Sequence, residues 1–164
     1  MQSRTLGIIT DFDYDGIVPT YEQKAFCADT LERLCNGLGL QYYVLLDEDK
    51  NEILPAFCYR DSRTEKVIPL VEEKIEPRDL YFKTGIQKQS FNTVYQLYAD
   101  KLSGKLDSAE YFLMMPEYLS FKLTGVIKNE YTNATTGSLV NAKTHDWDKD
   151  VISALDLPEK LFGT

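Results

Sequence analysis

The amino-acid sequence predicts an α/β fold in which helices outnumber strands. Two short apolar segments, Leu6–Thr10 and Tyr42–Leu46, are rich in the β-branched and aromatic residues that strands favour. Longer segments repeat apolar residues at helical spacing, most clearly over Asn92–Leu102. With 164 residues the chain is long enough to bury a substantial core, and one domain is the simplest expectation.

The first 41 residues are expected to form a strand, an acidic loop and a helix. The strand Leu6–Thr10 runs into the loop Asp11–Gly16. The segment Tyr21–Leu38 places apolar residues near one helical face, and glycines just beyond its last turn mark its end. We treat 1–41 as an atypical N-terminal strand-loop-helix segment.

The next part of the chain predicts a β-hairpin followed by two helices. Strands are predicted over Tyr42–Leu46 and Glu52–Tyr59, on either side of a charged turn. One helix is predicted over Thr64–Ile75. A second begins at Pro77, where the missing proline N–H costs nothing, and ends at Gly85.

Pro116 divides the apolar segment Asp107–Gly125, because a proline inside a helix removes a backbone hydrogen bond. We therefore predict one helix ending near Met115 and another starting at Pro116. The threonine-rich segment Tyr131–Thr136 is a predicted strand, and Asp146–Asp148 is expected to cap a final helix, Lys149–Leu155. Four residues are expected to form a stripe facing the core: Phe112, Met115, Leu119 and Leu123.

The composition excludes several classes of partner. A net charge of −8 and a pI near 4.7 oppose binding to nucleic acid and to anionic membrane surfaces. The apolar runs are too short to span a bilayer, and no secretory signal opens the chain, so we expect a cytoplasmic protein. A zinc site is not expected, because the three cysteines lie at unpatterned spacing and the chain has a single histidine.

The acidic loop carries a possible metal site. Asp11, Asp13, Asp15 and Glu22 fit the spacing of a calcium-binding EF-hand loop, with Gly16 at the sharp turn. An apolar strand running into Asp13 and Asp15 is also similar to the first motif of haloacid-dehalogenase-type phosphatases. A third interpretation is a solvated acidic turn without a ligand.

Four groups of motifs follow one another from residue 43 onward. They are YVLLD at 43–47 with YRDSRT at 59–64, TGIQ at 84–87 with FNTVYQL at 91–97, MPEYL at 115–119 with LTG at 123–125, and EYTNATT at 130–136 with WD at 147–148 and LFG at 161–163. In this order they resemble the rhamnulokinases of the FGGY carbohydrate kinase family. The resemblance covers roughly residues 42–164, which we therefore treat as a partial N-terminal domain of that family.

The resemblance implies a partial ribonuclease-H-like, actin-like ATPase domain. The family reaction is ATP-dependent phosphorylation of L-rhamnulose at its 1-hydroxyl, with ATP and Mg²⁺ as cofactors of the intact enzyme. By resemblance, the sugar-binding residues are Tyr59, Asp61 and Arg63, together with Phe91 and Asn92. An alternative is that Asp61 and Arg63 form a local salt bridge at the start of the helix predicted after them.

The same resemblance implies that reaction parts are missing. No glycine- and serine-rich phosphate loop occurs in the first forty residues, residues 36–41 replace a sugar-contacting D-T-W-G-like stretch, and the family's catalytic aspartate lies beyond LFG. We assign no catalytic residue and expect no turnover by this chain alone. The alternatives are a non-enzymatic remnant that forms homo-oligomers or complements another kinase fragment, and a small calcium-binding protein.

His145 is expected at the surface and Trp147 in the core.

Overall fold

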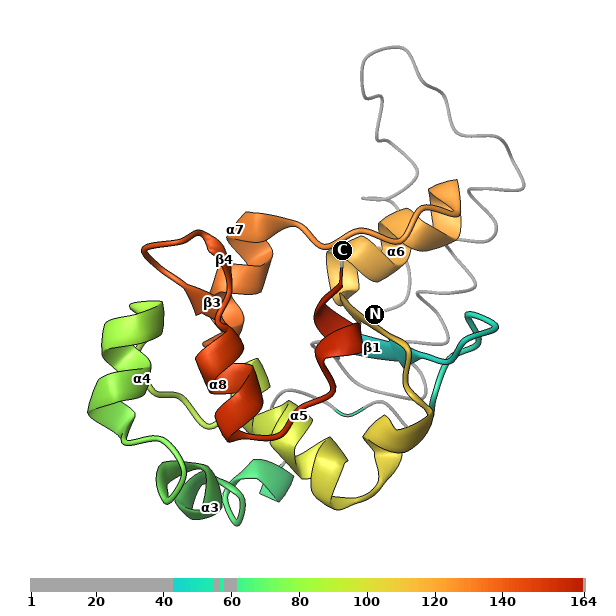
Figure 1. Ribbon diagram of the computed structural model, residues 1–164. Coiled ribbons are helices and arrows are strands. Elements are labelled where there is room, and N and C mark those ends of the chain that lie inside the picture. The colour runs from blue at the N-terminus through green and yellow to red at the C-terminus, as the bar shows by residue number, and fades with distance from the viewer. Residues whose placement is uncertain (1–42, 55–56, 58–61, 164) are drawn as a thin grey trace, which may run out of the picture.

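The computed structural model describes residues 43–54, 57 and 62–163 (Figure 1). The expectations for residues 1–41, including the strand, the acidic loop and the helix, lie outside this part of the chain, as do all three cysteines.

A two-stranded antiparallel ribbon lies at the centre of the fold. Strand β1 (Tyr43–Leu46) pairs with β2 (Tyr111–Met114), so that Tyr43 faces Met114 and Leu46 faces Tyr111. Side chains alternate between the two faces of a strand, and here both faces are buried. One face belongs to the larger core and the other to a smaller core beneath the helix that follows β2.

Strand β2 corrects the helix predicted over 107–115. That segment forms a 3-10 turn, η2 (Lys105–Ser108), and then the strand. A run of four apolar residues fits a buried strand as well as a buried helix, and pairing with the distant β1 decides between them.

The predicted hairpin is also different from the one observed. Its turn forms, with the Asp47 N–H donating to the Asn51 carbonyl over 3.0 Å. Beyond the turn, the described residues make one bridge between Leu46 and Glu52 and one hydrogen bond from the Ile53 N–H to the Leu45 carbonyl. The partner of β1 along its whole length is β2, and residues 58–61 of the predicted second strand lie outside the described part.

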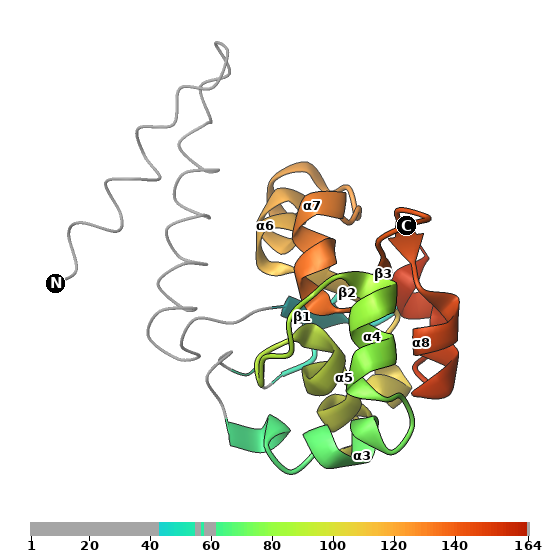
Figure 2. The same cartoon turned by 90° about the vertical axis from the view of Figure 1, so that its left-hand side faces the viewer.

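Helix α5 (Thr93–Leu102) packs between the ribbon and two shorter helices, α3 (Ile68–Glu72) and α4 (Pro77–Thr84) (Figures 1 and 2). Helices α4 and α5 begin and end close to where the sequence predicts. The helix predicted over 64–75 is instead a 3-10 turn, η1 (Ser62–Thr64), followed by α3. Pro69 lies in the first turn of α3 and lacks the N–H that would continue a helix from Thr64.

Helix α6 (Met115–Thr124) starts with Pro116 in its first turn, as predicted, and ends at Gly125 in the left-handed conformation. The expected apolar stripe is only partly correct, because Leu123 is 42% exposed. Tyr118 and Phe121 are the buried aromatic residues of α6.

The strand predicted over 131–136 is wrong. The segment forms α7 (Tyr131–Ala134) and the 3-10 turn η3 (Thr135–Gly137). Its start is fixed by the Glu130 carboxylate, which accepts hydrogen bonds from the backbone N–H groups of Thr132 and Asn133, each over 2.9 Å. A side-chain cap of this kind satisfies donors that the helix leaves open and outweighs the strand preference of threonine.

A short hairpin and two helical segments complete the chain. Strands β3 (Val140–Asn141) and β4 (Asp146–Trp147) pair antiparallel and lead into α8 (Lys149–Ala154) and the 3-10 turn η4 (Glu159–Phe162). Asp148 caps α8 by accepting from the Val151 N–H over 3.0 Å, as predicted.

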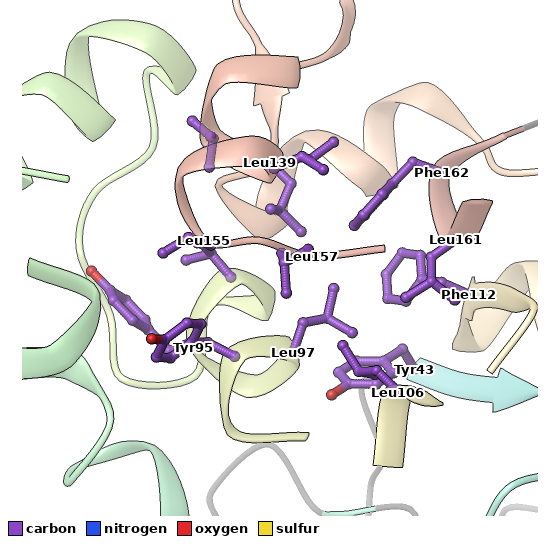
Figure 3. Packing of buried hydrophobic residues seen from close by; sticks show 14 of the residues in the cluster. Tyr43, Tyr95, Leu97, Leu106, Phe112, Leu139, Leu155, Leu157, Leu161 and Phe162 are labelled. Atoms are coloured by element: carbon purple, nitrogen blue, oxygen red, sulfur yellow. The ribbon is translucent and has the colours of Figure 1, made fainter. Parts of the chain in front are cut away.

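The larger core joins α5, α8, η4 and one face of the ribbon (Figure 3). In Figure 3, Phe112, Leu161 and Phe162 gather beside β1, and Leu97 and Leu157 lie between them and Leu155. Trp147 packs against this core, as expected for an anchor. Within the described residues, no helix has the length and apolar character needed to cross a membrane.

A close approach between η3 and α5 gives a test of this packing. A Cβ added at Gly137 would lie 3.0 Å from both Cβ and Oγ1 of buried Thr93. We expect Gly137→Ala to lower the free energy of unfolding by about 1–3 kcal/mol, the usual cost of overpacking a core, as measured by urea denaturation. Gly163→Ala is the control, because its added Cβ meets nothing closer than 3.4 Å. Equal effects of the two substitutions would contradict this account of the η3–α5 contact.

Candidate functional site

Arg63 is the first of the predicted sugar-binding residues that the structure describes. It lies in η1, and its guanidinium forms an ion pair with Asp100 of α5. The Tyr43 hydroxyl donates to the other carboxylate oxygen of Asp100 over 2.5 Å, and the Phe57 ring lies 4.0 Å from the guanidinium carbon. Asp100 is 1% exposed and Arg63 18% exposed, so this ion pair is largely withdrawn from water.

The electrostatics of this cluster favour a charged Arg63 beside a neutral Tyr43. Burial, reinforced by the negative charge of Asp100, raises the pKa of the Tyr43 hydroxyl well above its usual value. Burial lowers the pKa of Arg63, but the interactions with Tyr43 and Asp100 outweigh it, so that the pKa is raised overall. Tyr43 therefore remains a hydrogen-bond donor to Asp100 at neutral pH.

One partner of Arg63 lies far from it in the sequence, because Asp100 belongs to another element. The alternative of a local Asp61–Arg63 salt bridge stays a prediction, since Asp61 lies outside the described residues. Tyr59 and Asp61 lie outside the described residues, so their predicted roles stay predictions. The ion pair fastens the end of the YRDSRT segment to α5.

Asn92 and Phe91 lie at the opposite end of α5. The Asn92 side chain is buried; its Oδ1 accepts from the Gln89 N–H over 2.6 Å and its Nδ2 donates to the Thr136 carbonyl over 3.2 Å. Asn92 thus joins the start of α5 to the EYTNATT motif. Phe91 is half-buried, and its carbonyl accepts from Gln96 Nε2 over 2.7 Å.

The described sugar-binding candidates therefore do not form one cluster. Asn92 and Asp100, the partner of Arg63, are separated by eight positions of helix, which corresponds to about 12 Å at 1.5 Å per residue. Of the candidates, Phe91 is half-buried, whereas buried Asn92 holds backbone groups in place.

A pocket of about 440 Å³ lies elsewhere, between α7, the β3–β4 hairpin and η4. Its walls include Tyr131, His145, Trp147 and Phe162. Sequence reasoning placed His145 at the surface, where the structure has it, and Trp147 in the core, against which the structure packs it half-buried. It did not bring the two residues together. Residues 129–131 and 145–147 meet only because α7 packs beside the hairpin, and no spacing rule in the sequence gives that contact.

No metal site can be assigned to the described part of the chain, where no group of three or more His, Cys, Asp or Glu lies together. The candidate calcium ligands Asp11, Asp13, Asp15 and Glu22 lie outside that part.

Comparison with known proteins places this fold among sugar kinases. The sequence model for the N-terminal domain of the FGGY family of carbohydrate kinases matches residues 39–164. Rhamnulokinase from Halalkalibacterium halodurans is 50% identical over 122 residues, and that from Klebsiella pneumoniae is 39% identical over 124 residues. These matches cover 73% and 74% of this chain but only 26% and 25% of the relatives, so the chain spans about a quarter of their length.

Solved structures show the same fold. Xylulose kinase from Rhodospirillum rubrum superposes with a TM-score of 0.67 at 16% identity, covering 75% of this chain and 26% of that one. Ligand-bound xylulose kinase from Lactobacillus acidophilus gives 0.65 at 21% identity, covering 73% and 25%. The expected actin-like ATPase fold, present here as part of a domain, is thereby confirmed.

The buried ion pair gives a second test. In Asp100→Asn, Arg63 keeps its charge but loses its ion pair with the buried Asp100 carboxylate, and we expect the free energy of unfolding to fall by about 2–3 kcal/mol. Asp107→Asn is the matched control, because Asp107 is exposed on neighbouring η2. Thermal and urea unfolding of both variants measure the difference; an Asp100→Asn protein as stable as the control would show that the pair contributes nothing.

Proposed function

The chain belongs to the FGGY family of carbohydrate kinases, and we propose that it forms part of the sugar-binding lobe of a rhamnulokinase. The observation that carries this proposal is the 50% identity to a rhamnulokinase over 122 residues. The proposed reaction of the whole enzyme is transfer of a phosphoryl group from ATP to the 1-hydroxyl of L-rhamnulose. Because ATP is a cytoplasmic metabolite, we propose the cytoplasm as its location.

Some of the proposed sugar-binding residues contact the sugar, and the others hold the contacting residues in place. Phe91 offers its ring to the apolar face of the sugar, and Asn92 holds the turn that presents it. Tyr59 and Asp61 contact hydroxyl groups, and Arg63 fastens the end of their segment to α5 through Asp100. This division is supported by the hydrogen bonds of Asn92 and by the burial of the Arg63–Asp100 pair.

Phosphoryl transfer needs more than these residues. A carbohydrate kinase requires hydrogen-bond donors around the phosphates. It also requires Mg²⁺ and a carboxylate base for the attacking hydroxyl. ATP and Mg²⁺ are therefore proposed as cofactors of the whole enzyme, and we assign no residue of this chain to them. We propose that the 164 residues by themselves bind sugar without phosphorylating it.

Sugar binding and phosphoryl transfer can be measured separately. Saturation-transfer NMR of the purified chain with L-rhamnulose should show binding that Phe91→Ala loses, because the stacking face is removed. Phe82→Ala, which deletes a 64% exposed phenylalanine on α4, should bind as the parent does. With ATP and Mg²⁺ added, no L-rhamnulose 1-phosphate should form. Equal binding by both variants, no binding by the parent, or turnover by the chain alone would each contradict the proposal.

A further inference from the structure

The pocket beside Trp147 has the walls of a small-molecule site. Its volume of about 440 Å³ lies within the range of about 300–1,000 Å³ usual for ligand sites. Aromatic rings form two of its sides. The rings of Trp147 and Phe162 lie 5.1 Å apart between centroids, and those of Tyr131 and His145 lie 5.5 Å apart. Flat ring faces of this kind suit the C–H face of a sugar ring.

Its charge excludes anions. Glu130 and Asp146 line the pocket, and none of the described residues that line it is a lysine or arginine. A nucleotide or a sugar phosphate would therefore meet two carboxylates without a compensating cation. The pocket is suited to a neutral or cationic ligand.

Hydrogen bonds from the protein hold the two carboxylates of the pocket in place. Glu130 already accepts from Thr132 and Asn133, which lowers the pKa of its carboxyl, led by the Thr132 hydroxyl. The Asp146 carboxylate accepts from the backbone N–H of Trp147 over 2.7 Å. Carboxylates held in this way still present lone pairs to hydroxyl groups. The Tyr131 hydroxyl, bonded to His145 Nδ1 over 2.5 Å, adds another polar group at the wall.

We propose that this pocket is an accessory binding site for a neutral monosaccharide. It shares no residue with the sugar-binding candidates around Phe91 and Arg63, and it does not depend on which sugar the kinase phosphorylates. Tyr131 and His145 form a wall of the pocket that can be removed by substitution, and the fluorescence of Trp147 reports on binding.

Trp147 makes the proposal directly measurable, because it is the only tryptophan of the chain. L-rhamnose, a neutral deoxy sugar, should change the Trp147 fluorescence saturably at millimolar concentration. Tetramethylammonium chloride and inorganic phosphate, tested over the same range, should not. Saturation by either ion, or no saturable response to L-rhamnose, would overturn the proposal.

Variants locate the response. Tyr131 is 41% exposed and His145 is exposed, so removing them does not open the core. Tyr131→Ala and His145→Asn should each weaken L-rhamnose binding by about tenfold, which corresponds to about 1.4 kcal/mol. Asparagine is chosen because residue 145 has a φ of 60°, which asparagine tolerates.

Two controls separate this pocket from the proposed sugar-binding site around Phe91. Tyr81→Ala removes an exposed tyrosine on α4 and should leave the titration unchanged. Phe91→Ala should also leave the titration unchanged while abolishing binding at the proposed sugar-binding site around Phe91. A fluorescence response that survives in both Tyr131→Ala and His145→Asn, or that disappears in Phe91→Ala, would overturn the accessory site without deciding the proposed kinase function.

Discussion

The pairing of β1 with β2 is the interaction on which the described fold depends. It joins two segments that are distant in the sequence, and every residue of β1 is buried. One face of the ribbon meets α5, α8 and η4, and the other meets Tyr118 and Phe121 of α6. Because α6 begins where β2 ends, the strand also fixes where that helix starts. A shift of one residue in the pairing would exchange the two buried faces.

Helix α5 connects the ribbon to the sequence motifs of the family. Its first turn is tied to the EYTNATT motif through Asn92, and its last turns hold Arg63 of the YRDSRT motif through Asp100. Tyr43 of β1 donates to the same carboxylate. The ribbon, the helix and the described end of one sugar-kinase motif thus meet at a single buried carboxylate, which fastens that end of the motif to the core.

Local signals in the sequence were enough for some elements and insufficient for others. Proline and glycine at the helix ends predicted α4, and the Asp148 cap predicted α8, because such signals act within one helical turn. The same reasoning failed for β2 and α7. Distant strand pairing decides the first and the Glu130 carboxylate decides the second. The motif order predicted the family and the fold. It could not give the Arg63–Asp100 pair or the Trp147 pocket, which arise only when separate elements pack together.

Amide hydrogen exchange of the 164-residue chain, followed residue by residue by NMR, tests the central claim most directly. If the ribbon organises the fold, the amides that it buries over Tyr43–Leu46 and Tyr111–Met114 exchange as slowly as those of α5, and only on global unfolding. Rapid exchange in β1 and β2 alongside protected amides in α5, α6 and α8 would contradict the account, because the helices would then be stable without the ribbon.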